Sequence, residues 1–310
     1  MTVTGAPEFP VSLSATHSHI LAVLAGEVLR RSPAGATIRL LDVGCGDCRL
    51  LEFLAAALPQ ILEGRTIEVY GFDIAGHATQ PADFFDEARQ RLKATSPGAD
   101  WADRLRLIRE GDAWPYASAM FDVVVSNQVL EHVADADLFF AELARVLAPG
   151  GVSVHLFPSR HVMMEPHLHT PFVHWFGNVD LMRRWLALWA RTGRSAFGRW
   201  SASQPPQSGS VDRYARVHAD FLQRFTHYRT QGQVLRLVKS AGMHGSFSAS
   251  PGYLACAVSR KVRGRARQVA PPPPPIRNAA LTLLLRYLTS LTLVTTHDDD
   301  YSRLTGGEPG

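Results

Sequence analysis

The stretch LLDVGCGDCRLLEFLA, residues 40–55, sets a glycine-spaced turn between two apolar runs. The run before it, TIRLLDV at 37–43, predicts a buried strand, and the run after it, CRLLEFLAAAL, predicts a helix that Pro59 ends. The turn also contains a C-x-x-C pair, Cys45 and Cys48. A strand, a glycine turn and a helix in this order fit either a nucleotide-binding turn or a redox motif.

Strand-like and helix-like runs keep alternating along the next hundred residues. Strands separated by helices of this length predict right-handed β-α-β crossovers and a mostly parallel, doubly wound α/β sheet. The expected strands are 66–74, 104–112, 121–128 and 152–158, and the expected helices are 13–31, 82–94 and 135–147.

This alternation breaks after Pro158, where a stretch rich in His, Trp and Arg begins. A helix is expected at 230–243 with Thr230 as its N-cap, and strand-like runs at 245–250 and 253–260 predict a final antiparallel hairpin. The chain is therefore expected to divide into five segments. These are a helical segment at 1–35, a core at 36–158, a substrate or lid insertion at 159–222, the final helix and hairpin at 223–262, and a basic, proline-rich linker with an apolar tail helix at 263–310.

Composition indicates a globular protein with an uneven charge distribution. Hydrophobic residues make up 46% of the chain and charged residues 19%. Residues 1–150 carry 12 Lys and Arg against 20 Asp and Glu, whereas 151–310 carry 20 against 8. The second half could meet an anionic partner, or its arginines could form only a solvated surface. Three cysteines cannot form a full disulfide framework and no secretory signal is visible, so a cytoplasmic protein is expected.

The C-terminal apolar run at 276–296 follows a basic stretch and five consecutive prolines. The prolines predict a polyproline spacer that holds this tail away from the main domain. Arg286 lies mid-run, where it costs roughly 2.5 to 3.5 kcal/mol in a bilayer. An amphipathic helix is therefore expected, packed on the domain or lying on an anionic membrane through 260–296. Nucleic-acid binding is not expected, because no binding module is recognisable.

The glycine turn has the chemistry of an anion-binding site. Backbone N–H groups are unpaired in the first turn of a helix, and glycines let a ligand approach the chain closely. A dinucleotide fingerprint would place a third glycine where Arg49 stands, which weakens that interpretation. Redox chemistry is also disfavoured, because Cys45 lies between two turn glycines and not at the helix N-terminus.

Two segments together resemble the class I S-adenosylmethionine-dependent methyltransferases. Residues 40–55 are similar to the first motif of that family, and FDVVVSNQVLEHVADADLFFAELARVLAPGGVSVHLFP at 121–158 is similar to its downstream motifs. The resemblance implies a Rossmann-like sheet, S-adenosylmethionine as cofactor and methyl transfer as the activity. The expected acceptor is a small molecule, a lipid-linked intermediate or a glycan, methylated on oxygen, nitrogen or carbon.

The resemblance also implies which residues hold the cofactor. Gly44 and Gly46, with Cys45 between them, would form the turn against the methionine part, and Asp42 would organise that turn. Asp73 would accept the ribose hydroxyls, because a carboxylate can take two donors at once. The remaining contacts would come from Ile74 beside Asp73, from Asp112 and Ala113 at the adenine amine, and from the strand-end amides Asn127 and Gln128.

Histidines are the candidate catalytic residues, because a hydroxyl, amine or carbon acceptor needs a base. His167 and His169 follow the last core strand, and His132 begins the helix after the fourth strand, next to Glu131. A zinc site is not expected, since no cysteine pair or H-E-x-x-H helix accompanies the histidines. We therefore expect no metal.

An aromatic stripe in the insertion predicts a helix that covers the site, unless the stripe is ordinary core. Four arginines on the same stretch could hold a phosphate or carboxylate of the acceptor. The stripe consists of Trp175, Phe176, Trp185, Leu186, Leu188 and Trp189, and the arginines are Arg183, Arg184, Arg191 and Arg194.

Two functions of other classes remain open at this point. One is an NAD(P)-type oxidoreductase on a related sheet, which the residue at position 49 disfavours. The other is a non-catalytic protein that keeps the cofactor pocket while the histidine-rich stretch binds a partner. Measuring the binding of S-adenosylmethionine, its demethylated product and NAD would distinguish the methyltransferase, the oxidoreductase and the non-catalytic protein.

Overall fold

The computed structural model describes residues 14–75, 84–95, 98–205, 208–263 and 283–300. Its centre is a seven-stranded sheet with the order β3-β2-β1-β4-β5-β9-β8. The first five strands in this order are parallel, and towards one edge β9 pairs antiparallel with both β5 and β8. The strands are β1 Thr37–Val43, β2 Thr66–Ile74, β3 Leu105–Ile108, β4 Phe121–Asn127, β5 Leu147–Phe157, β8 Met243–Ser246 and β9 Leu291–His297.

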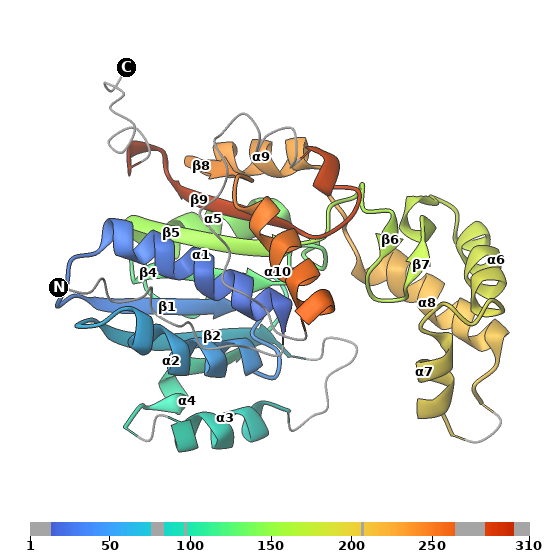
Figure 1. Ribbon diagram of the computed structural model, residues 1–310, viewed down its shortest axis with the longest axis horizontal. Coiled ribbons are helices and arrows are strands. Elements are labelled where there is room, and N and C mark those ends of the chain that lie inside the picture. Colours follow the sequence, from blue (N-terminus) through green and yellow to red (C-terminus); the bar gives the residue numbers. More distant parts are fainter. Residues whose placement is uncertain (1–13, 76–83, 96–97, 206–207, 264–282, 301–310) are drawn as a thin grey trace.

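Helices cover both faces of the sheet, as expected of a doubly wound α/β fold. One face packs against α1 Ala15–Arg31, α2 Arg49–Ile61, α3 Phe84–Thr95 and α4 Trp101–Arg104, and α1 and α10 Ser250–Arg263 lie side by side there (Figure 1). The other face packs against α5 Ala136–Val146 and α9 Gln231–Ser240. The predicted Rossmann-like architecture with antiparallel C-terminal strands is confirmed.

The insertion forms a lobe beside the sheet with an apolar core of its own (Figure 1). Leu186, Tyr214 and Ala219 are fully buried in that core. The lobe contains β6 Met164–Glu165, β7 Thr170–Pro171, the 3-10 turn Val173–Trp175, α6 Val179–Ala190, α7 Phe197–Ser203 and α8 Val211–Phe225.

The helix that begins the final segment follows the sequence prediction closely. Thr230 is the N-cap of α9, and its hydroxyl accepts from Gln233 N while the Gln233 side chain accepts from Thr230 N. This reciprocal capping box satisfies two N–H groups that a helix start leaves unpaired. The helix end at Pro59 is wrong, because α2 continues to Ile61. Burial of Ile61 and Leu62 against the sheet offsets the hydrogen bond that the proline lacks.

The strand predicted at 253–260 is wrong, because these residues belong to α10. Tyr253 and Cys256, one helical turn apart, pack towards the core, and Cys256 is fully buried. The second antiparallel strand is β9 instead, formed by residues assigned above to a tail helix. Its alternation of Leu and Thr in LTLVTTH has a strand period, and both faces are buried.

The tail therefore does not stand away from the domain over 291–297, since β9 pairs with both β5 and β8. A continuous amphipathic helix over 276–296 is excluded by this strand, because residues 291–297 are paired within the sheet. The polyproline spacer and the adjoining 264–282 lie outside the described residues. Within the described part of the chain, no helix is both long and apolar enough to cross a membrane.

Candidate functional site

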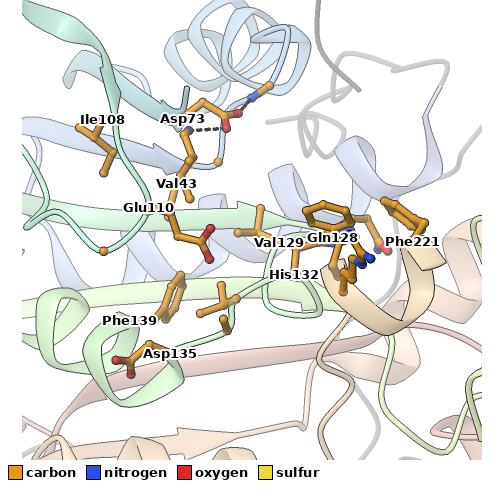
Figure 2. Close-up of a pocket in the computed structure, with 18 of the residues that line it drawn as sticks. Val43, Asp73, Ile108, Glu110, Gln128, Val129, His132, Asp135, Phe139 and Phe221 are labelled. Atoms are coloured by element: carbon orange, nitrogen blue, oxygen red, sulfur yellow. Dashed lines mark hydrogen bonds between the residues drawn. The ribbon is translucent and has the colours of Figure 1, made fainter. Parts of the chain in front are cut away.

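A pocket of about 930 Å³ lies where β1, β2 and β4 end, between the sheet and the insertion lobe. The strand order changes direction between β1 and β4, and open α/β sheets bind ligands at the carboxyl ends beside such a switch. Figure 2 shows Asp73 and Ile108 at one end of this pocket and His132 and Phe221 at the other. We call the first the turn end and the second the helix end.

Gly44 makes the turn end possible. Its φ is +66°, and a β-carbon built on it would lie 2.6 Å from Val129 Cγ2. Residues with a β-carbon rarely adopt that dihedral, and no β-carbon fits at that distance. Gly46, with φ +53°, also lines the pocket. The Gly44 N–H donates to the Phe72 carbonyl, which fastens the turn to β2. Glycine is therefore the one residue that fits at position 44 without displacing Val129 or straining the backbone.

Asp73 closes this turn from the end of β2. Its Oδ2 accepts from the Gly46 N–H at 2.5 Å, and its Oδ1 accepts from its neighbour Ile74 at 2.6 Å (Figure 2). Both Asp73 and Ile74 line the pocket. Asp42 lies behind the turn and is 2% exposed. Burial, and then the charge of Asp73, raise the pKa of Asp42. Of the two carboxylates, the one at the pocket surface is Asp73.

The remaining predicted cofactor residues divide into two that line the pocket and two that do not. Asp112 and Gln128 line it, whereas Ala113 and Asn127 lie outside the lining residues. Asp112 Oδ2 also accepts from the Arg109 N–H at 3.0 Å, so it closes a local turn. Gln128 has φ +58°, and its amide donates to Ser290 Oγ at 3.2 Å. Asp112 and Gln128 therefore both line the pocket and form hydrogen bonds within the protein.

The two turn cysteines are buried packing residues. Cys45 and Cys48 are free thiols with their sulfurs 3.5 Å apart, and both belong to the apolar cluster under α2. Burial raises the pKa of the Cys45 thiol, which disfavours the reactive thiolate. Cys48 caps α2 with φ +60°, a conformation in which glycine is usual. Its side chain lies in the core and away from the pocket.

An apolar floor between the two ends was not predicted from sequence. Phe72, Trp114 and Phe139 line the pocket, with ring centroids 5.1 Å apart for Phe72 and Trp114 and 5.3 Å apart for Trp114 and Phe139. Ile108 extends this surface at the turn end. The sequence signal for this floor is that Trp114 directly follows Asp112 and Ala113, which were predicted to lie at the adenine. The floor suits a flat, partly apolar ligand such as a nucleobase.

The helix that forms the pocket wall is α8, not α6. Val217, Phe221 and Arg224 of α8 line the pocket, with Trp200 from α7. The predicted aromatic stripe instead packs α6 behind α8, where Leu186 is buried, while Leu188 points to solvent. None of the four arginines expected to hold an anionic acceptor lines the pocket, and Arg183 pairs with Asp180 and Asp220.

Two of the three predicted catalytic histidines meet at the helix end. His132 and His167 have ring centroids 5.1 Å apart, and both line the pocket. His132 Nδ1 donates to the Phe225 carbonyl at 2.7 Å. His169 is exposed and lies outside the lining residues, and its carbonyl accepts from Trp189 Nε1. The structure therefore brings His132 and His167 together and leaves His169 apart.

A buried carboxylate holds His167 in place. Glu165 is fully buried, and its Oε1 accepts from His167 Nδ1 at 2.7 Å and from the Tyr228 hydroxyl at 2.6 Å. Burial alone would raise the pKa of Glu165, but bonds from His167, Tyr228 and the Leu168 N–H hold it below its ordinary value. Burial likewise opposes the charge on His167, yet Glu165 holds the pKa of His167 above its ordinary value.

Glu131 completes this cluster from the same turn as His132. Its side chain is 1% exposed, and within the described residues neither carboxylate oxygen accepts a hydrogen bond from another residue. Burial raises the pKa of Glu131 to about 8, against partial opposition from its own backbone N–H and then from His167. One candidate ligand atom each from Glu131, His132 and His167 lies within 4.8 Å of the other two. The sequence places Glu131 next to His132, but it did not predict that His167 lies beside them.

The chain leaving the insertion is fastened to the same turn. The His227 N–H donates to the Glu131 carbonyl, and Arg229 donates to the carbonyls of Leu130 and Val133 at 3.1 and 2.7 Å. The chain entering the insertion is tied to it too, since the Arg160 N–H donates to the Arg229 carbonyl. The exit of the insertion is therefore bonded to the Glu131–His132 turn, and the entry is bonded to that turn through Arg229.

Comparison with known proteins identifies the core. Residues 41–153 match the family described as "Methyltransferase domain". Two similar proteins are ubiquinone biosynthesis O-methyltransferases, from Brucella anthropi with 33% identity over 115 residues and from Mesorhizobium japonicum with 31% over 144. The alignments cover 37% and 46% of this chain and 39% and 49% of those proteins. The chain thus matches less than half the length of either relative.

A solved structure described as an S-adenosylmethionine dependent methyltransferase from Mesorhizobium loti aligns with 87% of this chain and 95% of that chain. The identity is 17% and the TM-score is 0.42. The family match covers the end of β1, the glycine turn, Asp73 and the Glu131–His132 turn. It decides between the methyl-donor and dinucleotide interpretations of that turn in favour of the former. Residues 41–153 therefore match a methyltransferase domain, and this match supports S-adenosylmethionine as the cofactor that the sequence resemblance implies.

Proposed function

We propose that the protein methylates a hydroxyl group of a small-molecule or lipid-linked acceptor. The observation that carries this proposal is one pocket with a cofactor turn at one end and a cluster of Glu131, His132 and His167 at the other. The O-methyltransferase names of the two relatives support oxygen as the methylated atom. The apolar floor and α8 wall favour an acceptor with a largely apolar body.

The residues at the turn end fit the cofactor. Its methionine part would lie against Gly44 and Gly46, where a side chain at position 44 would fill the space. Asp73 Oδ1 and Oδ2 each accept one backbone N–H, and because a carboxylate oxygen can accept more than one donor, Asp73 would also accept the ribose hydroxyls. The adenine would lie over Ile108 and Trp114, near Asp112. The bound cofactor supplies a methyl group on a positively charged sulfur.

The residues at the helix end would prepare the acceptor. Methyl transfer is an in-line displacement, so the pocket must hold the acceptor oxygen on the line from sulfur to methyl. Phe221 and Val217 would position the acceptor body, and its hydroxyl would reach the cluster at His132 and His167. A neutral hydroxyl must lose its proton as the oxygen–carbon bond forms. His132 and His167 are the proposed catalytic residues, and His169 is not among them.

Calorimetry tests the cofactor half of the proposal. S-adenosylmethionine and its demethylated product should bind with one site per chain, and Asp73→Ala should weaken both by about 10-fold or more, because about two hydrogen bonds at 0.5–1.5 kcal/mol each are lost. Asp47→Ala is the matched control, because Asp47 lies in the same turn but is exposed and outside the lining residues. Binding of NAD in place of the sulfur nucleotides would overturn the proposal, and so would equal affinity in folded Asp73→Ala protein.

Mass spectrometry tests the acceptor half. Extracts separated into lipid, glycan and small-molecule fractions would be incubated with the protein and methyl-labelled S-adenosylmethionine. Label should enter the lipid or small-molecule fraction as a methyl ether. His167→Ala should abolish that transfer while cofactor binding is unchanged. Label in nitrogen or carbon positions would refute the hydroxyl acceptor, and no labelled product despite cofactor binding would favour a non-catalytic binding protein.

A further inference from the structure

We propose that Glu131, His132 and His167 bind a divalent transition-metal ion of the zinc type at the helix end of the pocket. This proposal departs from the expectation, based on sequence motifs, that the chain holds no metal. The role that we give the ion rests on the proposed function, because the ion would bind the acceptor hydroxyl. The binding site itself rests on geometry alone.

The ligand set is the first argument. Two imidazoles and one carboxylate, the combination found in catalytic zinc sites with an open coordination position, come together here. Their ligand atoms lie within 4.8 Å of one another. Zinc–ligand distances of about 2.0–2.2 Å require about 3.4 Å between the ligand atoms of a tetrahedral site. Side-chain rotations that move these atoms by about 1 Å would bring them to that separation. Imidazole ligands favour zinc, cobalt, nickel or iron over magnesium and calcium.

The bonds behind the ligands are the second argument. His132 donates through Nδ1 to the Phe225 carbonyl, and His167 donates through Nδ1 to Glu165, each at 2.7 Å. A proton on Nδ1 leaves the lone pair of the neutral ring on Nε2. Metal-binding histidines almost always donate their other nitrogen to a backbone carbonyl or a carboxylate in this way. Tyr228 in turn orients Glu165.

The third argument is the buried carboxylate. Glu131 is 1% exposed, and the part of the chain that the structure describes gives its oxygens no ion pair and no hydrogen bond from another residue. Buried charges in proteins are paired with an opposite charge or coordinate a metal. Glu165, by contrast, has three donors. A cation beside Glu131 would supply the partner that this carboxylate needs.

In the reaction, the acceptor hydroxyl would occupy the open coordination position. Binding to the cation lowers the pKa of the hydroxyl, so its proton leaves to water. The oxygen lone pair then forms the bond to the methyl carbon, and the carbon–sulfur pair returns to sulfur, which becomes a neutral thioether. The balance is one hydroxyl and one sulfonium consumed, and one ether, one thioether and one proton formed.

The test uses untagged full-length protein, stripped with a chelator and then titrated with Co²⁺ and Zn²⁺. Calorimetry and the visible absorption of Co²⁺ should show one site per chain. Glu131→Gln and His167→Ala should each weaken binding by at least 10-fold, and Glu165→Gln should weaken it by 10- to 100-fold through the loss of orientation. His169→Ala is the matched control from the same segment and should bind the ions like wild type.

Two further measurements keep the outcomes distinct. Circular dichroism confirms that each variant is folded, and calorimetry with S-adenosylmethionine on stripped protein tests the cofactor site independently. Cofactor binding without metal binding would overturn the metal site and leave the proposed function standing. Metal binding unchanged in folded Glu131→Gln and His167→Ala would also overturn it. Failure to bind the cofactor in both stripped and metal-loaded protein would overturn the proposed function instead.

Discussion

Gly44 carries a restriction that can be measured directly. Its positive φ and the 2.6 Å approach to Val129 leave no room for a side chain. We expect Gly44→Ala to lower the free energy of unfolding by about 1–2 kcal/mol from the dihedral alone, and more from the overlap. Urea denaturation measures this change. The substituted turn should also lose cofactor affinity, because Gly46 and Asp73 depend on its path.

Gly26 is the matched control for that substitution. It is exposed within α1, and a β-carbon there meets nothing within 4 Å. Alanine in a helix interior is favoured over glycine by roughly 0.5–1 kcal/mol, so Gly26→Ala should stabilise the protein. Equal effects of the two substitutions would contradict the role of the turn.

His155 should make stability depend on pH. Burial lowers its pKa to about 3, and its two nitrogens bond to Ser126 Oγ and Ser153 Oγ inside the sheet. In the unfolded chain the imidazole titrates near its ordinary value of about 6.5, so below that pH the unfolded state binds one more proton. Stability therefore rises with pH through this window and falls as pH drops from about 6.5 towards 3.

Urea denaturation at pH 7, 6 and 5 tests this dependence. Wild type should lose up to about 1.4 kcal/mol more per pH unit below pH 6 than His155→Gln, which keeps hydrogen-bonding groups but has no titrating proton. Parallel curves for the two proteins would show that His155 does not titrate on unfolding.

At the scale of elements, β9 lies between β5 and β8, although 133 positions separate its first residue from the end of the core segment at 158. Leu293 is fully buried there, so Leu293→Ala should cost about 2–5 kcal/mol. Leu284 is 58% exposed, and Leu284→Ala should change stability by less than about 0.5 kcal/mol. Thermal and urea denaturation of both variants measures the difference, and a small effect at Leu293 would mean that β9 is not part of the sheet.

The elements also show which sequence patterns were reliable. β1, β2 and β4 were predicted because their apolar runs are bounded by turn residues. The runs at 253–260 and 291–297 are both short and apolar, and periodicity alone does not separate a short buried strand from a helix. What decides between them is contact with α1 in one case and with β5 in the other.

At the scale of the molecule, sequence predicted the turn end of the site better than the helix end. Gly44, Gly46 and Asp73 are short-range consequences of one strand–turn–helix unit and its neighbour. Glu131 and His167 are 36 positions apart, and only the path of the insertion brings them together. The choice of α6 as the pocket wall was wrong because an amphipathic stripe shows that a helix is half-buried, not what it is buried against.

The distribution of charge along the sequence did not predict which charged residues line the pocket. The basic second half suggested an anionic partner, but Arg183 is held by Asp180 and Asp220, and Arg229 by backbone carbonyls. Arg224 and Arg109 are the arginines that line the pocket. Net charge describes the surface potential of a protein, and local pairing decides which charges a ligand meets.

The fastening of both insertion ends at the Glu131–His132 turn has an evolutionary consequence. Arg160, His227 and Arg229 fix the entry and exit of the lobe, and the lobe has its own core beyond them. Substitutions in α7 and in the pocket face of α8 would then alter the acceptor while the methyl-transfer centre stayed intact. With the proposed function, α7 and α8 are the elements in which new substrate preferences could diverge while the glycine turn and the cluster of Glu131, His132 and His167 stay unchanged.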